Sequence, residues 1–244
     1  VLDGTLNATG ASIILTANAI EGLDSSLIAG SIKADIENAP ASGSTFISDD
    51  DGLLIAPCLE GSVCLGNMEA INRIEIGLDS NNDVISLFIE QATVNATDIG
   101  IITRTDIVMG TNGINTELNA TGTLFANSLT GNVELRDAAI NADQILLDAA
   151  GSVLGTGFLT SDNDIGISVG NSIILGGIDT AGELTTSDAV GGDLEGSYTL
   201  PGDFIVGFFS QGSSSIDVSA DGSIDIFGAS STGDISLLAG GDVF

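Results

Sequence analysis

The sequence contains no histidine, and only four lysine and arginine residues stand against 34 aspartates and glutamates. Without histidine the usual Ser-His-Asp triads are excluded, and no spacing singles out a catalytic pair among so many carboxylates. The net charge of −30 disfavours nucleic-acid binding, which depends on lysine and arginine contacts with phosphate. We therefore expect a protein that is not an enzyme, has no catalytic residues and binds no nucleic acid.

Long hydrophobic runs and aromatic residues are scarce as well. Hydrophobic residues make up 43% of the chain, but their runs are far shorter than the roughly 18–20 residues that a membrane helix needs. Aromatic residues make up only 4%, with no tryptophan and one tyrosine. Because a broad globular core normally uses aromatic side chains to fill its interior, this scarcity favours a thin core of stacked Ile, Leu, Val and Ala. The sequence predicts no transmembrane segment.

Only two cysteines occur, Cys58 and Cys64, in the segment APCLEGSVCLGN. With no histidine and no further cysteine, a zinc site is disfavoured. The spacing allows a local disulfide loop to close, and in an oxidising compartment we expect Cys58 and Cys64 to be bridged. The alternative is a pair of thiols that pack as small apolar residues.

What the sequence has in abundance is short alternating strands at regular spacing. In residues 214–243 the strands begin at Ile216, Ile224 and Ile235, so that a short step is followed by a longer one. Upstream, strands that begin at Leu124, Val133 and Ile145 show the same short and long steps. Gly, Ser, Asp and Ala separate the strands, and no helical pattern intervenes. Such spacing is typical of a chain that winds into a solenoid. We predict an all-β fold, a β-solenoid with about 20 residues per coil.

A pentapeptide also recurs, since Leu-Asn-Ala-Thr-Gly occupies both 6–10 and 118–122, and residues 95–97 repeat its centre. These asparagines are formal glycosylation sequons. In a solenoid, asparagine and threonine at turns are better explained by side-chain hydrogen bonds to the backbone. The pentapeptide is too short to define a period by itself.

Two segments interrupt the strand pattern. Residues 36–70 hold two prolines, an acidic triplet and both cysteines, and residues 179–203 hold the only tyrosine and the last proline. We interpret both as loop or hairpin excursions from the solenoid, and residues 1–244 as one solenoid domain. Because no capping segment is recognisable at either end, we expect the domain to be part of a longer chain or of a polymer.

Acid-rich turns are the only candidate metal sites. Calcium takes six to eight oxygen ligands, and closely spaced aspartates supply several of them. None of the turns matches an EF-hand loop, so ordinary polar turns are the alternative, and no other cofactor is expected. The calcium candidates are Asp49, Asp50, Asp51, Asp162 and Asp164.

The segment DGSIDIFGASSTGDISLLAGGDV, residues 221–243, resembles the repeats of filamentous-haemagglutinin-type exoproteins and related large bacterial adhesins. The likeness is best over 204–244, fair over 118–178 and poor over 36–70 and 179–203. It implies a right-handed parallel β-helix that Gram-negative bacteria secrete and display at the cell surface. That family has no fixed binding residues to transfer to this chain.

From these observations we expect an extracellular structural or adhesive β-solenoid, such as the shaft of a surface adhesin. One alternative is a self-assembling subunit of an extracellular filament or surface layer, in which the ends of neighbouring copies pair by β-augmentation. Another is a β-helix that binds or cleaves carbohydrate. The expected partners are neighbouring repeats of the same chain or further copies end to end, and a host or cell-surface glycan or protein.

Overall fold

The computed structural model describes residues 4–17, 20–36, 62–78, 84–110, 116–182, 184–187, 199–200, 202–211, 216–231 and 234–244. In these ranges the regular structure is entirely β-strand. The strands are β1 (Gly4–Ala17), β2 (Ile20–Ile36), β3 (Ser62–Ile76), β4 (Ser86–Ile89), β5 (Thr93–Ala96), β6 (Asp98–Thr103), β7 (Ile107–Met109), β8 (Thr116–Ser128), β9 (Val133–Leu135), β10 (Ala138–Ala149), β11 (Val153–Leu154), β12 (Phe158–Ser161), β13 (Ile165–Val169), β14 (Ile173–Thr180), β15 (Leu184–Ser187), β16 (Thr199–Leu200), β17 (Phe204–Gln211), β18 (Ile216–Ala220), β19 (Ile224–Ile226), β20 (Ala229–Ser231) and β21 (Ile235–Ala239).

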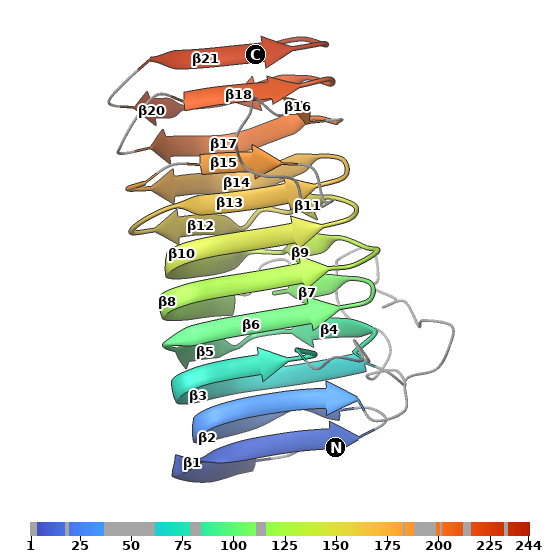
Figure 1. Cartoon of the computed structure of the whole chain (residues 1–244), viewed down its shortest axis with the longest axis vertical. Coiled ribbons are helices and arrows are strands. Elements are labelled where there is room, and N and C mark those ends of the chain that lie inside the picture. The colour runs from blue at the N-terminus through green and yellow to red at the C-terminus, as the bar shows by residue number, and fades with distance from the viewer. Residues whose placement is uncertain are drawn as a thin grey trace.

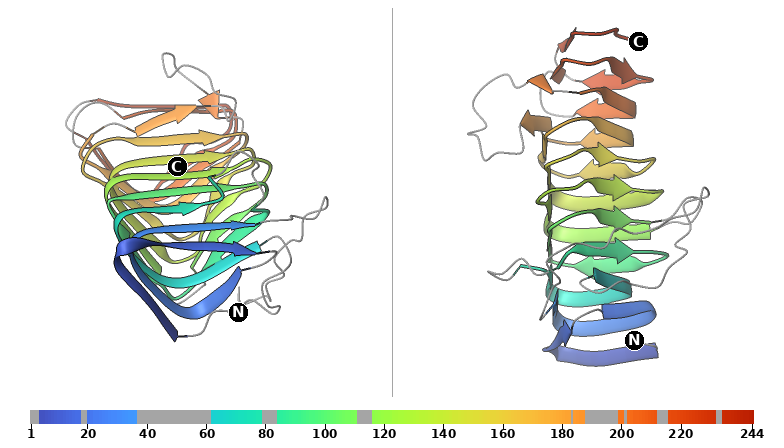
Figure 2. Two further views of the ribbon diagram at one scale, coloured as in Figure 1. Left: turned by 60° about the horizontal axis from the view of Figure 1, so that its bottom comes forward. Right: turned by 90° about the vertical axis from the view of Figure 1, so that its right-hand side faces the viewer.

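The strands wind into a single β-solenoid whose coils stack along one axis (Figures 1 and 2). Strand pairs such as β1–β2, β8–β10 and β13–β15 are parallel, and each joins a strand to its counterpart in a neighbouring coil. In Figure 1 the chain rises from the N-terminus to the C-terminus, and strands on the near side, such as β10, run left to right while β12 runs back. This sense of winding is right-handed, so the predicted parallel β-helix is confirmed.

Each complete coil contributes three strand segments, and corresponding segments form three ladders. β4, β7 and β9 belong to the first ladder. β5, the start of β8, the start of β10 and β12 belong to the second. β6, the end of β8, the end of β10 and β13 belong to the third. β8 and β10 therefore each bend across the corner between the second and third ladders.

The predicted period agrees with the observed register. In the third ladder Leu124 pairs with Ile145, and near the C-terminus Ile216 on β18 pairs with Ile235 on β21. Both pairs join residues at equivalent positions of the sequence repeat. One inward column of the third ladder runs through successive coils as Ile13, Ile32, Ile74, Ile99, Leu124, Ile145, Ile165 and Leu184.

The core is a thin stack of aliphatic side chains, because successive residues of a strand point alternately inward and outward. Leu118, Leu124 and Ile140 are fully buried, and each such side chain contributes about 1.5–3 kcal/mol relative to exposure. Two aromatic rings enter the core from β17, where Phe204 and Phe209 are buried with ring centroids 6.1 Å apart. Because equivalent aliphatic side chains stack on one another from coil to coil, the narrow interior needs few aromatic rings.

Both predicted excursions include residues that the structure places in strands. Residues 62–70 belong to β3, which pairs with β2 and β4, so this part of the first predicted excursion is strand. In the second, β14 extends to Thr180 and β15 pairs with β13. These segments enter the ladders because inward aliphatic residues continue there, a pattern that the proline and cysteine content obscured. Residues 37–61 and 188–198 lie outside the described residues.

Candidate functional site

An asparagine ladder runs along the outside of the second ladder. β5, β8 and β10 place Asn95, Asn119 and Asn141 at equivalent outward positions. The Nδ2 of Asn119 donates to Oδ1 of Asn95 at 3.0 Å, and the Nδ2 of Asn141 donates to Oδ1 of Asn119 at 2.9 Å. The pentapeptide copy at 118–122 and its partial copy at 95–97 thus occupy one corner of successive coils, because Leu118 points inward while Asn119 and Asn95 join the ladder.

A second column of short polar side chains marks the corner before the first ladder. Each side-chain oxygen accepts the backbone N–H of the residue at the same position one coil later. The pairs, with the accepting side chain named first and the donating backbone N–H second, are Asp106 and Asn132 (2.8 Å), Asn132 and Ser152 (2.9 Å), Ser152 and Ser172 (3.2 Å), Ser172 and Asp203 (3.0 Å), and Asp203 and Ser223 (2.7 Å). We call this column the corner ladder. Glycine directly precedes several members of the corner ladder. At Gly151, for example, there is no room for a side chain, because a Cβ would collide with Asn132 of the preceding coil.

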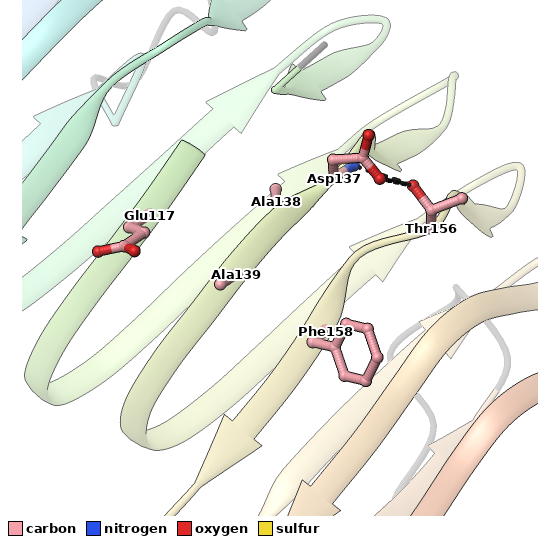
Figure 3. Close-up of a pocket in the computed structure, with 6 residues that line it drawn as sticks. All are labelled: Glu117, Asp137, Ala138, Ala139, Thr156 and Phe158. Carbon is pink, nitrogen blue, oxygen red and sulfur yellow. Dashed lines mark hydrogen bonds between the residues drawn. The ribbon is translucent and has the colours of Figure 1, made fainter. Parts of the chain in front are cut away.

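A hollow of about 240 Å³ opens on the outer face of the second ladder (Figure 3). An outward column crosses it, from Glu117 on β8 through Ala139 on β10 and Phe158 on β12 to Gly177 on β14. The side chain at 139 ends at its Cβ, which leaves a gap between Glu117 and the Phe158 ring. The residues that line the hollow are Glu117, Asp137, Ala138, Ala139, Thr156 and Phe158.

The aromatic wall of this hollow is held by close packing. Phe158 is 49% exposed, whereas Phe204 and Phe209 are buried in the core. The ring lies against Gly177, where an added Cβ would collide with it. The glycine one coil later therefore gives the ring a fixed seat and leaves its other side open.

The acidic rim of the hollow is held by a pair of hydrogen bonds. The backbone N–H of Asp137 donates to Oγ1 of Thr156 at 3.0 Å, and that hydroxyl donates to Oδ1 of Asp137 at 2.5 Å, as the dashed line in Figure 3 marks. Asp137 has φ of 51°, in the left-handed region that aspartate tolerates better than most residues. The turn therefore positions the Asp137 carboxylate beside the hollow.

The pKa of one acid on the outer face of the third ladder, Asp148, is shifted from its ordinary value. Asp148 on β10 lies in register with Asn127 and Ser168 on the adjacent coils. Partial burial removes water from its carboxylate and raises the pKa of Asp148 above the ordinary value of 3.8. Ionisation of this group is therefore less favourable in the folded protein than in water.

The predicted calcium residues divide into two sets. Asp162 and Asp164 flank an exposed corner between β12 and β13, where the Asn163 Nδ2 donates to Oδ1 of Asp143 at 2.7 Å. The backbone carbonyl of Asp164 accepts the N–H of Ile145 at 3.1 Å, so that oxygen already has a partner. Among the described residues no group of three or more acidic or cysteine side chains converges as a metal site would require. Calcium binding at this turn stays a prediction. The other candidates, Asp49, Asp50 and Asp51, lie outside the described residues.

The predicted disulfide can be placed at one end only. Cys64 lies on β3 with 1% of its surface exposed, between Glu21 and Phe88 in the register of the first ladder. Its expected partner, Cys58, lies outside the described residues. The Cys58–Cys64 bridge therefore stays a prediction.

Two basic residues pair with an acid on the same strand or turn. Arg73 forms an ion pair with Glu75, and Arg136 donates to Glu134 from Nη2 at 2.7 Å and from Nε at 2.9 Å. Because residues two apart in a strand point to the same side, this spacing brings each guanidinium to a carboxylate. The Arg73 side chain is exposed, and exposed pairs of this kind contribute about 0–1 kcal/mol each.

Residue patterns alone did not identify the hollow. Its residues come from separate coils, and none of them belongs to a motif. The only signal in the sequence is the pairing of the outward Phe158 with Gly177 one coil later, and it becomes visible once the register is known.

Within the described ranges the structure has no helix with the length and apolar character needed to cross a bilayer. Comparisons with known proteins add no further assignment. No protein-family model, no curated protein and no solved structure matches this chain.

Proposed function

We propose that this chain is an extracellular structural and adhesive rod, the shaft of a bacterial surface adhesin. The observation that carries the proposal is the stacking of coil on coil along one axis (Figure 2), in which parallel ladders and polar columns connect each coil to the next. Such a body is a stiff, extended rod with long outer faces. A function in which surface and length matter suits it better than one that needs a deep cavity.

The proposed location is the cell surface of a Gram-negative bacterium, after secretion. The support is the resemblance of residues 221–243 to adhesin repeats, together with a net charge of −30, which keeps a β-rich surface from aggregating. In this proposal the outer faces contact a glycan or protein on another cell. No catalytic role is proposed.

The proposal is tested by attachment and by shape. Beads coated with the purified chain are expected to attach to cell monolayers more often than beads coated with an inert protein of equal charge, while electron micrographs show single rods. Equal attachment of the two kinds of bead would contradict the adhesive role. Compact particles in the micrographs would contradict the rod.

A self-assembling filament subunit is the second candidate, in which coils of neighbouring copies would stack on one another. The inward-facing Ile235 on β21 is 48% exposed, and Val243 and Phe244 beyond it are also exposed. A further coil stacked on β21, from the same chain or from another copy, would cover these side chains. Sedimentation velocity over a hundredfold concentration range separates the two candidates. A particle mass that stays that of one chain would contradict the filament.

A further inference from the structure

We propose that the hollow over β8, β10 and β12 binds an alkylammonium group, which is a primary amine on a short methylene stem. A lysine side chain and a free polyamine share this chemistry. The proposal does not depend on the role as a shaft, because the site is defined by its own six residues: Glu117, Asp137, Ala138, Ala139, Thr156 and Phe158.

The charge of the site selects a cation. Glu117 stands on one side of the hollow and Asp137 on its rim (Figure 3), and both carboxylates accept hydrogen bonds but donate none. In a chain with a net charge of −30 the potential at such a site attracts cations and repels anions.

The aromatic wall adds a preference for an organic cation over a metal ion. A cation that lies over the face of an aromatic ring within about 6 Å of its centroid is attracted by the ring quadrupole. Phe158 offers a half-exposed ring whose seat on Gly177 fixes its position before a ligand arrives. A small metal ion would instead need several converging oxygens, and in the described part of the chain no group of three acidic or cysteine side chains provides them.

The floor and the size of the hollow suit the short methylene stem of the proposed ligand. Ala138 and Ala139 leave an apolar strip between the carboxylate of Glu117 and the ring of Phe158 (Figure 3). Glu117 and Phe158 are two rungs apart, which at the usual strand spacing is about 9.5 Å. The volume of about 240 Å³ lies below the roughly 300–1,000 Å³ of sites for drug-sized ligands. A single alkyl chain fits these dimensions, with its ammonium between the ring and a carboxylate.

Calorimetric titration of the intact chain at physiological salt tests the proposal. The probes are spermidine, a blocked lysine peptide and, as a neutral ligand, maltose. We expect Phe158→Ala and Glu117→Gln each to weaken binding of the cationic probes at least fivefold. Ala139→Leu fills the hollow without a change of charge, and we expect it to abolish binding. Circular dichroism checks that each variant keeps the fold.

Two control variants separate this site from general attraction to an acidic surface. Phe227 is an 83% exposed phenylalanine away from the hollow, and Glu69 is an exposed glutamate on the outer face of β3. Phe227→Ala and Glu69→Gln should leave the affinity within twofold of the parent. Equal losses in the control and site variants would overturn the proposal, and so would unchanged binding in Ala139→Leu.

The choice of probes identifies the source of the ligand. Binding of spermidine alone assigns the site to free polyamines, binding of the lysine peptide alone assigns it to a protein partner, and binding of both supports the shared alkylammonium chemistry. Binding of maltose with no binding of either cation would overturn the proposal in favour of a sugar site.

Discussion

Replacing Leu118 by alanine should destabilise the protein far more than replacing Leu6, although both residues open the same pentapeptide, Leu-Asn-Ala-Thr-Gly. Leu118 is 0% exposed and pairs with Val94 below it and Ile140 above it in the second ladder. Leu6 holds the equivalent inward position in β1 but is 42% exposed, and among the described residues its ladder partner is Leu27 on one side. The two substitutions therefore compare one local sequence in two packing environments.

The magnitude follows from the carbon atoms that are removed. Leucine to alanine removes three carbons, and at about 0.8 kcal/mol for each buried group this is about 2.4 kcal/mol at Leu118. The residual cavity between two rigid rungs raises the expected loss to about 3–5 kcal/mol. At Leu6 slightly more than half of the side chain is buried and water can fill the space, so the expected loss is about 1.4 kcal/mol.

Urea unfolding followed by circular dichroism gives both values from the shift of the midpoint and the slope. Because an end coil of a repeat protein can unfold before the rest, hydrogen exchange of the β8 and β1 amides serves as the second measurement. Losses of equal size in the two variants would refute the reasoning. They would mean that the pentapeptide acts through its local turn and not through stacking.

Three further predictions concern backbone strain, protonation and metal binding. Gly155 has φ of 129° and a Cβ there would collide with a carbonyl oxygen of the preceding coil, whereas Gly4 has φ of 89° with open space around it. We expect Gly155→Ala to lower the free energy of unfolding more than Gly4→Ala does, with a strain cost of about 1–3 kcal/mol common to both, and equal losses would contradict the collision. Because burial raises the pKa of Asp148, the protein loses stability as the pH rises from 3.8 through the folded-state pKa. Asp148→Asn should therefore raise the melting temperature at pH 7, with a difference that disappears below about pH 3.8; an unchanged melting temperature at pH 7 would contradict the desolvation. If calcium binds at Asp162 and Asp164, EDTA should lower the melting temperature, and Asp162→Asn combined with Asp164→Asn should remove that effect. A melting temperature that EDTA leaves unchanged would refute the calcium hypothesis.

The strand period was predictable because inward aliphatic residues repeat at the same step as the coils. Leu124 and Ile145, which define the period in the sequence, are a ladder pair in the structure, and so are Ile216 and Ile235. Handedness did not follow from the pattern itself, since the same period fits a coil of either hand. It entered as an implication of the adhesin likeness.

Contacts between coils could not be predicted, because coil lengths vary along the chain. In the second ladder the step from Leu118 to Ile140 is longer than the next step, from Ile140 to Leu159. A change of one or two positions moves a side chain to another partner or another face. The seat of Phe158 on Gly177 depends on that detail, which is why no residue pattern indicated the hollow.

The corner ladder has a consequence for how such a chain can change in length. The bond from Ser152 to Ser172 spans 20 residues and the bond from Ser172 to Asp203 spans 31, yet the N···O distances are 3.2 and 3.0 Å. The corner bond thus recurs with the same geometry after a longer connection, beside the ladder in which β14 pairs with β17. Loops can therefore be grafted or removed between these anchor points, and the rod can gain new surface features during evolution without a change in its core.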